Sequence, residues 1–96
     1  MRFKDIDPNK EYKHNEIWDY VYERDSGYCQ KCGRNQGSQQ HHIIPKSKLG
    51  KTTANNLILL CQECHIGEGH CFSDEDKKNF WNNLVKNEKK FRERLI

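Results

Sequence analysis

Two pairs of cysteines have the spacing of metal ligands. Cys29 and Cys32 form one Cys-x-x-Cys pair, Cys61 and Cys64 form another, and 28 residues separate the two pairs. Four thiolates can complete a closed tetrahedral zinc site, which has no open position and is therefore structural. The spacer exceeds the ~15 to 20 residues of a simple four-cysteine finger, so we expect it to hold a module of its own.

A redox-active pair is the competing interpretation of each Cys-x-x-Cys motif. It fits poorly because no βαβ pattern surrounds either pair. The fifth cysteine, Cys71, has no partner at a matching spacing, and we expect it to be a free thiol near the metal site.

Three histidines add a second kind of chemistry. His41 and His42 are adjacent within the spacer, and His65 follows the last paired cysteine. Adjacent residues of a strand point to opposite faces, so one imidazole can hold a metal while the other addresses a substrate. Phosphodiester cleavage needs such a pairing, because a neutral imidazole can activate water and a cation can stabilise charge on phosphate. From spacing alone, surface or zinc-adjacent histidines without a catalytic role are an equally good interpretation.

Five elements must position these residues. They are a helix over 14–25, short strands over 41–44 and 57–60, a short helix starting at 61, and a helix over 74–95. Ser73 is the predicted N-cap of the last helix, whose first turn is acidic as the helix dipole favours. We therefore expect one α+β domain over residues 1–96.

The composition leaves little material for a hydrophobic core. Of the 96 residues, 33% are hydrophobic and 32% are charged, and the mean hydropathy is -1.15. A domain this small and polar is expected to need a metal, a disulfide or a partner for stability. No apolar run approaches the ~18 to 20 residues of a membrane span, so no membrane partner is expected. The start of the chain lacks a signal-peptide pattern, which favours the cytoplasm, where paired cysteines more often bind metal.

Positive charge is concentrated in the middle and at the end of the chain. The formal net charge is +3, with residues 1–28 acidic and residues 29–96 basic. A modest basic excess is compatible with a phosphate backbone as partner, although charged residues usually form a solvated face.

The motifs together resemble one known family. The segments that carry the resemblance are Asp25 to Gly33, His41 to Pro45 with Gly50, and Asn56 to His65. This combination, over roughly residues 17–70, is similar to the HNH endonucleases with zinc-binding cysteine pairs. The resemblance implies a ββα-metal (His-Me finger) motif with a core over about 28–70, flanked by the two longer helices.

The resemblance also implies a role for each site residue. His42 corresponds to the general base, and His41 and His65 correspond to ligands of a single catalytic divalent cation. Asn56 corresponds to the residue that holds the loop between the strands by hydrogen bonds to backbone, and so positions the base.

This sequence departs from the family pattern at two of the metal ligands. The first ligand is often Asp in cysteine-paired members and is His41 here, which shifts the expected preference from Mg2+ toward Mn2+, Ni2+ or Zn2+. A further ligand is often found four residues after the last histidine, where Gly69 stands here. His70, one residue later, is a weak substitute as a ligand.

The implied function is metal-dependent hydrolysis of DNA phosphodiester bonds, by nicking or double-strand cleavage, leaving 5′ phosphates. Lysines of the loop beside the histidine pair are candidates to contact phosphates, namely Lys46, Lys48 and Lys51. A phage or mobile-element setting, with a packaging or other protein partner, follows from the resemblance alone. The alternative is a zinc-stapled module that binds nucleic acid or protein and does no chemistry.

Overall fold

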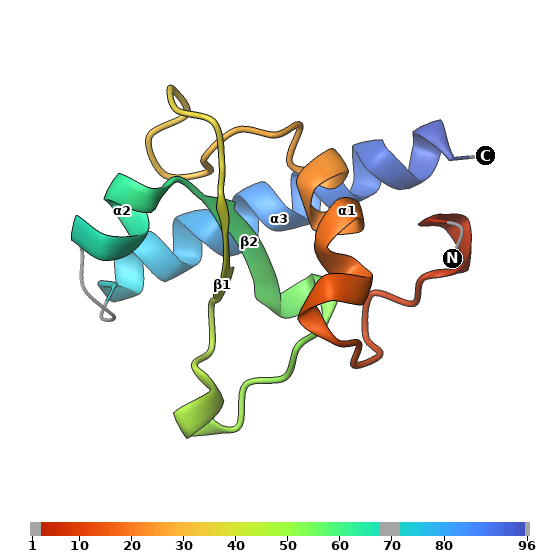
Figure 1. The fold of residues 1–96 in the computed structure, drawn as a ribbon, viewed down its shortest axis with the longest axis horizontal. Helices are drawn as coiled ribbons and strands as arrows, with labels where there is room; N and C mark the ends of the chain where they lie inside the picture. Colours follow the sequence, from red (N-terminus) through yellow and green to blue (C-terminus); the bar gives the residue numbers. More distant parts are fainter. Residues whose placement is uncertain (1–2, 68–71, 96) are drawn as a thin grey trace.

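The computed structural model describes residues 3–67 and 72–95 and shows a small α+β fold (Figure 1). Its regular elements are α1 (His14–Arg24), β1 (Gln39–His42), β2 (Leu57–Leu60), α2 (Gln62–Gly67) and α3 (Asp74–Arg94). Single turns of 3-10 helix occur at Phe3–Asp5, Lys46–Lys48 and Ala54–Asn56. The predicted fold class is confirmed.

The two strands form an antiparallel hairpin in which Gln39 lies opposite Leu60 and His42 lies opposite Leu57. The prediction of a strand over 41–44 was wrong by two residues. Gln39 and Gln40 also pair with β2. Because both side chains are polar, a pattern of apolar residues does not mark them as part of a strand. Beyond His42, the Ile44 amide donates to a side chain, the Asn56 carboxamide oxygen, at 2.8 Å, and the chain turns away from the ladder.

All four residues of β2 are buried, and they divide the core into two clusters. Leu57 and Leu59 pack with α1, whereas Ile58 and Leu60 pack beside Cys29 and Cys61. The first cluster comprises Ile6, Ile17, Tyr20, Val21, Ala54, Leu57, Leu59 and Phe91. The second comprises Cys29, Ile43, Ile58, Leu60, Cys61, Phe72, Phe80 and Leu84. Alternation along one strand therefore serves two separate apolar surfaces.

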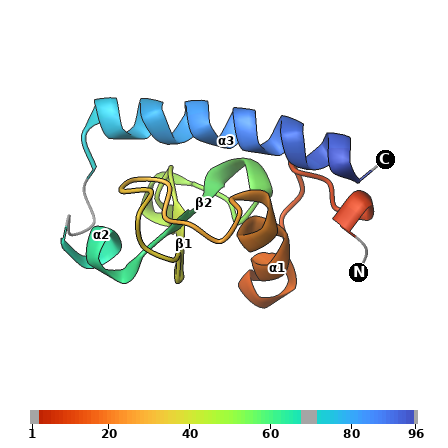
Figure 2. The same cartoon turned by 90° about the horizontal axis from the view of Figure 1, so that it is seen from above.

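Helix α3 crosses both clusters. Figure 2 shows it running along one side of the molecule, past the sheet and as far as α1. Phe80 and Leu84 contribute to the cluster beside the cysteines, and Phe91 contributes to the cluster beside α1. The predicted cap is present, because the Ser73 hydroxyl accepts a hydrogen bond from the Asp76 amide at 3.1 Å. Such a cap is worth about 1 kcal/mol.

A buried charge pair joins α1 to the sheet. The side chains of Arg24 and Asp25 are fully buried, and Arg24 Nε lies 2.9 Å from Asp25 Oδ1. The guanidinium also donates to the carbonyl oxygens of Ala54 and Leu57, both at 2.6 Å. Asp25 Oδ2 accepts from the Leu59 amide at 3.0 Å. The pair therefore satisfies backbone groups on both sides of the entry into β2.

A carboxylate on α3 lies next to this pair. Glu88 Oε2 is 3.6 Å from Arg24 Nη1, and the Tyr20 hydroxyl donates a hydrogen bond to Glu88. Burial, together with the hydrogen bond to Glu88, raises the pKa of Tyr20 well above its usual range. Polar contacts thus connect α1 and α3 through the apolar core.

We expect Arg24→Met to lower the free energy of unfolding by about 3 kcal/mol or more, because it leaves Asp25 as a buried charge without its partner. The exposed Arg34 provides the matched control, and Arg34→Met should change stability by no more than ~0.5 kcal/mol. Urea unfolding of both variants measures the difference. Equal losses in the two variants would contradict the role assigned to the buried pair.

Candidate active site and metal centre

The four paired cysteines meet at one point. One Sγ atom from each of Cys29, Cys32, Cys61 and Cys64 lies within 4.8 Å of the others. Cys32 Sγ and Cys61 Sγ are 3.9 Å apart, and a zinc ion bound at ~2.3 Å by a sulfur tetrahedron would separate the sulfurs by about 3.8 Å. The cluster therefore has the composition and dimensions of a four-thiolate metal site.

Local backbone structure prepares these sulfurs for a cation. The turn after α1 carries the first pair, and there the Lys31 amide donates to Cys29 Sγ at 3.4 Å. The second pair lies at the start of α2, where the Cys64 amide donates to Cys61 Sγ at 3.5 Å. Backbone amides of Asn35 and Arg34 lower the pKa of Cys32 to about 6. Thiolates held by amide donors are soft ligands, which suit zinc rather than magnesium.

His41 lies among aromatic rings on the α2 and α3 side of β1. Its ring centre is 5.6 Å from that of His65, on α2, and 4.8 Å from that of Phe72. Two imidazoles that share an ion at a metal–nitrogen distance of ~2.1 Å have ring centres roughly 5 Å apart. The separation of the His41 and His65 rings is therefore near that of two imidazoles on one ion.

His42 lies on the opposite face of β1. Its Nε2 is 3.0 Å from Thr52 Oγ1, and its ring centre is 5.0 Å from that of His14 at the start of α1. Burial lowers the pKa of His42, and the nearby charges of His14 and Lys46 lower it further. These surroundings favour the neutral imidazole, which is the form able to accept a proton.

Asn56 fastens the loop between the strands at its base. This residue is 6% exposed. Its Oδ1 accepts from the Ile44 amide at 2.8 Å, and its Nδ2 donates to the carbonyl oxygens of Ile44 and Lys51 at 3.0 and 2.9 Å. These hydrogen bonds join Asn56 to backbone groups at two points of the loop.

Sequence reasoning missed His14 and Thr52 as neighbours of His42. Thr52 is close to the histidine pair in sequence but follows a loop whose path no pattern predicts. His14 is 28 residues earlier, and no spacing rule connects it to the strand. His70, the weak candidate ligand, and Cys71, the predicted free thiol, lie outside the described residues.

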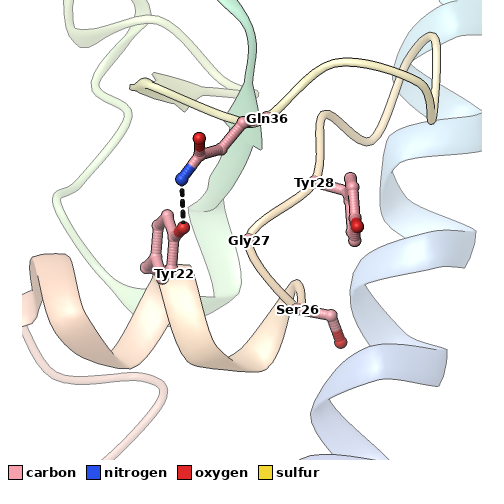
Figure 3. Close-up of a pocket in the computed structure, with 5 residues that line it drawn as sticks. All are labelled: Tyr22, Ser26, Gly27, Tyr28 and Gln36. Atoms are coloured by element: carbon pink, nitrogen blue, oxygen red, sulfur yellow. Dashed lines mark hydrogen bonds between the residues drawn. The ribbon is translucent and has the colours of Figure 1, made fainter.

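A cavity of about 210 Å³ lies at the end of α1, lined by Tyr22, Ser26, Gly27, Tyr28 and Gln36. In Figure 3, Tyr22 and Gln36 meet on one side of Gly27, and Tyr28 lies on the other. Gln36 Nε2 donates to the Tyr22 hydroxyl at 2.6 Å. Gly27 has a φ of +74°, and a Cβ there would lie 2.9 Å from the Tyr22 hydroxyl. The lining includes none of the predicted catalytic residues that the structure describes.

Comparisons with family models and with known proteins return several matches. The family model described as HNH endonuclease matches residues 29–70, which contain the four cysteines and the histidine pair. The type IV methyl-directed restriction enzyme EcoKMcrA of Escherichia coli is 33% identical over 55 residues, covering 48% of this chain and 20% of that enzyme. Anaredoxin of Nostoc sp. is also 33% identical over 55 residues, covering 56% of this chain and 72% of that protein. No solved structure is significantly similar.

The chain belongs to the HNH endonuclease family. It spans about a fifth of the Escherichia coli enzyme, so the similarity concerns one part of that protein. Among the described residues, no helix combines the length and the apolar character needed to span a bilayer.

We expect the purified protein to contain one zinc ion per chain and the four paired thiols to be protected from alkylation. Cys61→Ser should abolish zinc retention and unfold the domain, because the metal supplies folding free energy. Cys71→Ser is the matched control and should retain the ion. Metal analysis, thiol alkylation and circular dichroism measure these outcomes. Rapid alkylation of all five thiols in the native protein would contradict a metal-bound cluster.

Proposed function

We propose that this protein is a metal-dependent endonuclease that hydrolyses DNA phosphodiester bonds. The observation that carries the proposal is the division of the adjacent histidines between two environments. His41 lies beside His65 in an arrangement suited to a cation, whereas His42 is held against Thr52 at the base of a basic loop. Family membership supports the same conclusion.

In the proposed reaction, the neutral ring of His42 accepts a proton from a water molecule as the water oxygen attacks phosphorus. The bond between phosphorus and the 3′ oxygen breaks, the 3′ oxygen takes a proton from solvent, and the phosphate stays on the 5′ end. A divalent cation held by His41 and His65 would supply positive charge beside the phosphate. Asn56 acts as a positioning residue, since it fixes the backbone two residues after His42.

The loop after β1 supplies charge for the phosphate backbone. Lys46, Lys48 and Lys51 project from it, and no acidic residue occurs between Asp25 and Glu63. The same stretch contains both histidines of the pair. We infer that these lysines contact phosphates on either side of the bond that is cut. The phage or mobile-element setting and the protein partner stay predictions from the resemblance.

We expect His42→Ala to reduce metal-dependent nicking of a supercoiled plasmid by ~100-fold or more, the usual contribution of a general base. Reactions with Mg2+, Mn2+, Ni2+ and Zn2+ identify the effective cation. His14→Ala is the matched comparison, because it removes the neighbouring imidazole from the same cluster. Zinc content and the unfolding midpoint should be unchanged in both variants.

The comparison has two outcomes that contradict the proposal in different ways. A larger loss of nicking activity in His14→Ala than in His42→Ala would show that His14, and not His42, is the general base. Equal nicking by the wild type and by His42→Ala would indicate a contaminating nuclease, and would favour a zinc-stapled binding module without catalysis.

A second test concerns the loop lysines. We expect the triple replacement of Lys46, Lys48 and Lys51 by Gln to weaken the salt dependence of binding to duplex DNA. The slope of log affinity against log salt concentration should become less negative by up to about 3, because each phosphate contact contributes about 0.9 to it. The control replaces an equal number of exposed lysines on α3 by Gln, namely Lys78, Lys86 and Lys89. Fluorescence anisotropy at several salt concentrations measures both slopes. The same slope change in both triple variants would show that net charge alone attracts DNA.

A further inference from the structure

Leu49 is the most exposed of the large hydrophobic side chains that stand out on the described surface, at 90%. It lies in the loop between β1 and β2, directly after the 3-10 turn Lys46–Lys48. In Figure 1 this loop projects beyond the end of the hairpin, away from the three helices. The leucine therefore packs into neither of the two core clusters.

The backbone at Leu49 is in the left-handed region, with φ 67° and ψ 21°. Residues with a Cβ adopt this region at a cost, which glycine avoids and asparagine largely avoids. A leucine here adds no burial to offset that cost, so the stability of the fold does not account for it. Such an outlier is a reason to look for a function in binding.

The loop holds Leu49 in a fixed position. The amides of Lys48 and Gly50 both donate to the Pro45 carbonyl oxygen at 2.9 Å, and the Leu49 amide donates to the Lys46 carbonyl oxygen at 3.0 Å. A Cβ at Gly50 would lie 1.7 Å from the Ile44 carbonyl oxygen, so only glycine permits this closure. The Asn56 side chain then fastens both ends of the loop. The leucine is consequently presented on a tight, closed turn.

The surroundings of Leu49 favour an anionic partner. Lys46, Lys48 and Lys51 flank it, and the nearest acidic residues in sequence are Asp25 and Glu63. An apolar tip between cations suits a partner with negative charge outside and an apolar interior. Stacked base pairs between two phosphate backbones have that arrangement, and proteins that kink DNA insert apolar side chains between base steps.

We propose that Leu49 is a wedge that inserts between adjacent base pairs of duplex DNA and opens the stack beside the phosphate that His42 addresses. The loop begins directly after His42 and Ile43, so the wedge and the base act at the same end of the hairpin. The loop lysines hold the flanking phosphates, and the opened step displaces the backbone toward the histidines. This inference rests on the proposed nuclease function.

The test measures base stacking apart from cleavage. The 96-residue protein with His42→Ala is mixed with a duplex that contains 2-aminopurine, whose fluorescence rises when the base is unstacked. Fluorescence energy transfer between the duplex ends reports bending. We expect both signals to change on binding. Leu49→Asn, added to this background, should abolish both changes while keeping the salt dependence of binding, because asparagine suits the backbone but is polar. Leu49→Met should restore them.

The same substitutions are then made in the nuclease with His42 intact. Leu49→Asn should reduce plasmid nicking by about 10-fold or more, since opening a base step has a substantial energetic cost that the wedge offsets. Val85→Asn is the matched control, because Val85 is a 65% exposed apolar residue on α3, outside the loop. That variant should nick like the wild type.

Three results would overturn the wedge. Binding of His42→Ala protein without unstacking would leave Leu49 available for a protein partner instead. Full unstacking and nicking by Leu49→Asn would show that another group opens the step. If the unmodified protein neither binds duplex DNA nor nicks it, the proposed function itself is wrong. This outcome differs from the first two, in which DNA binding or nicking persists.

Discussion

The arrangement of the site depends on the hydrogen bonds of the buried Arg24 guanidinium. It binds the carbonyl oxygens of Ala54 and Leu57, which enclose the turn that carries Asn56. Asn56 in turn fastens the loop that follows His42. A charge in the core therefore begins a short path of contacts from α1 to the backbone of Ile44, two residues after the proposed general base. The ion pair with Asp25 offsets the energetic cost of burying the guanidinium. The Asp25 carboxylate accepts a further hydrogen bond from the Leu59 amide.

The sequence predicted those features that depend on local spacing. Each Cys-x-x-Cys pair is recognisable as a ligand pair from its spacing alone, although the meeting of the two pairs depends on the fold. The Ser73 cap and the apolar strand over 57–60 are equally local, and both are present. The family resemblance added the residues of the hairpin, since spacing alone left the histidines without an assigned role.

The features that sequence reasoning missed all depend on contacts between distant segments. Arg24 and Asp25 are charged, and charged residues at a helix end are normally assigned to the surface, yet both are 2% exposed. Gln39 and Gln40 are too polar for an apolar pattern, and only their partners in β2 show that they belong to a strand. The position of His14 next to His42 results from the packing of α1 against the hairpin, for which the chain carries no local signal.

The division of the core between two clusters affects how the domain unfolds. β2 and α3 each contribute to both clusters, so neither cluster can separate without disturbing a shared element. The domain should therefore lose its structure in one cooperative step, despite its small size and the local nature of its metal site. Backbone amides of β2 and of the adjoining part of α1 should then exchange with solvent through the same global opening. A metal at one end of the molecule would thereby govern the lifetime of hydrogen bonds at the other.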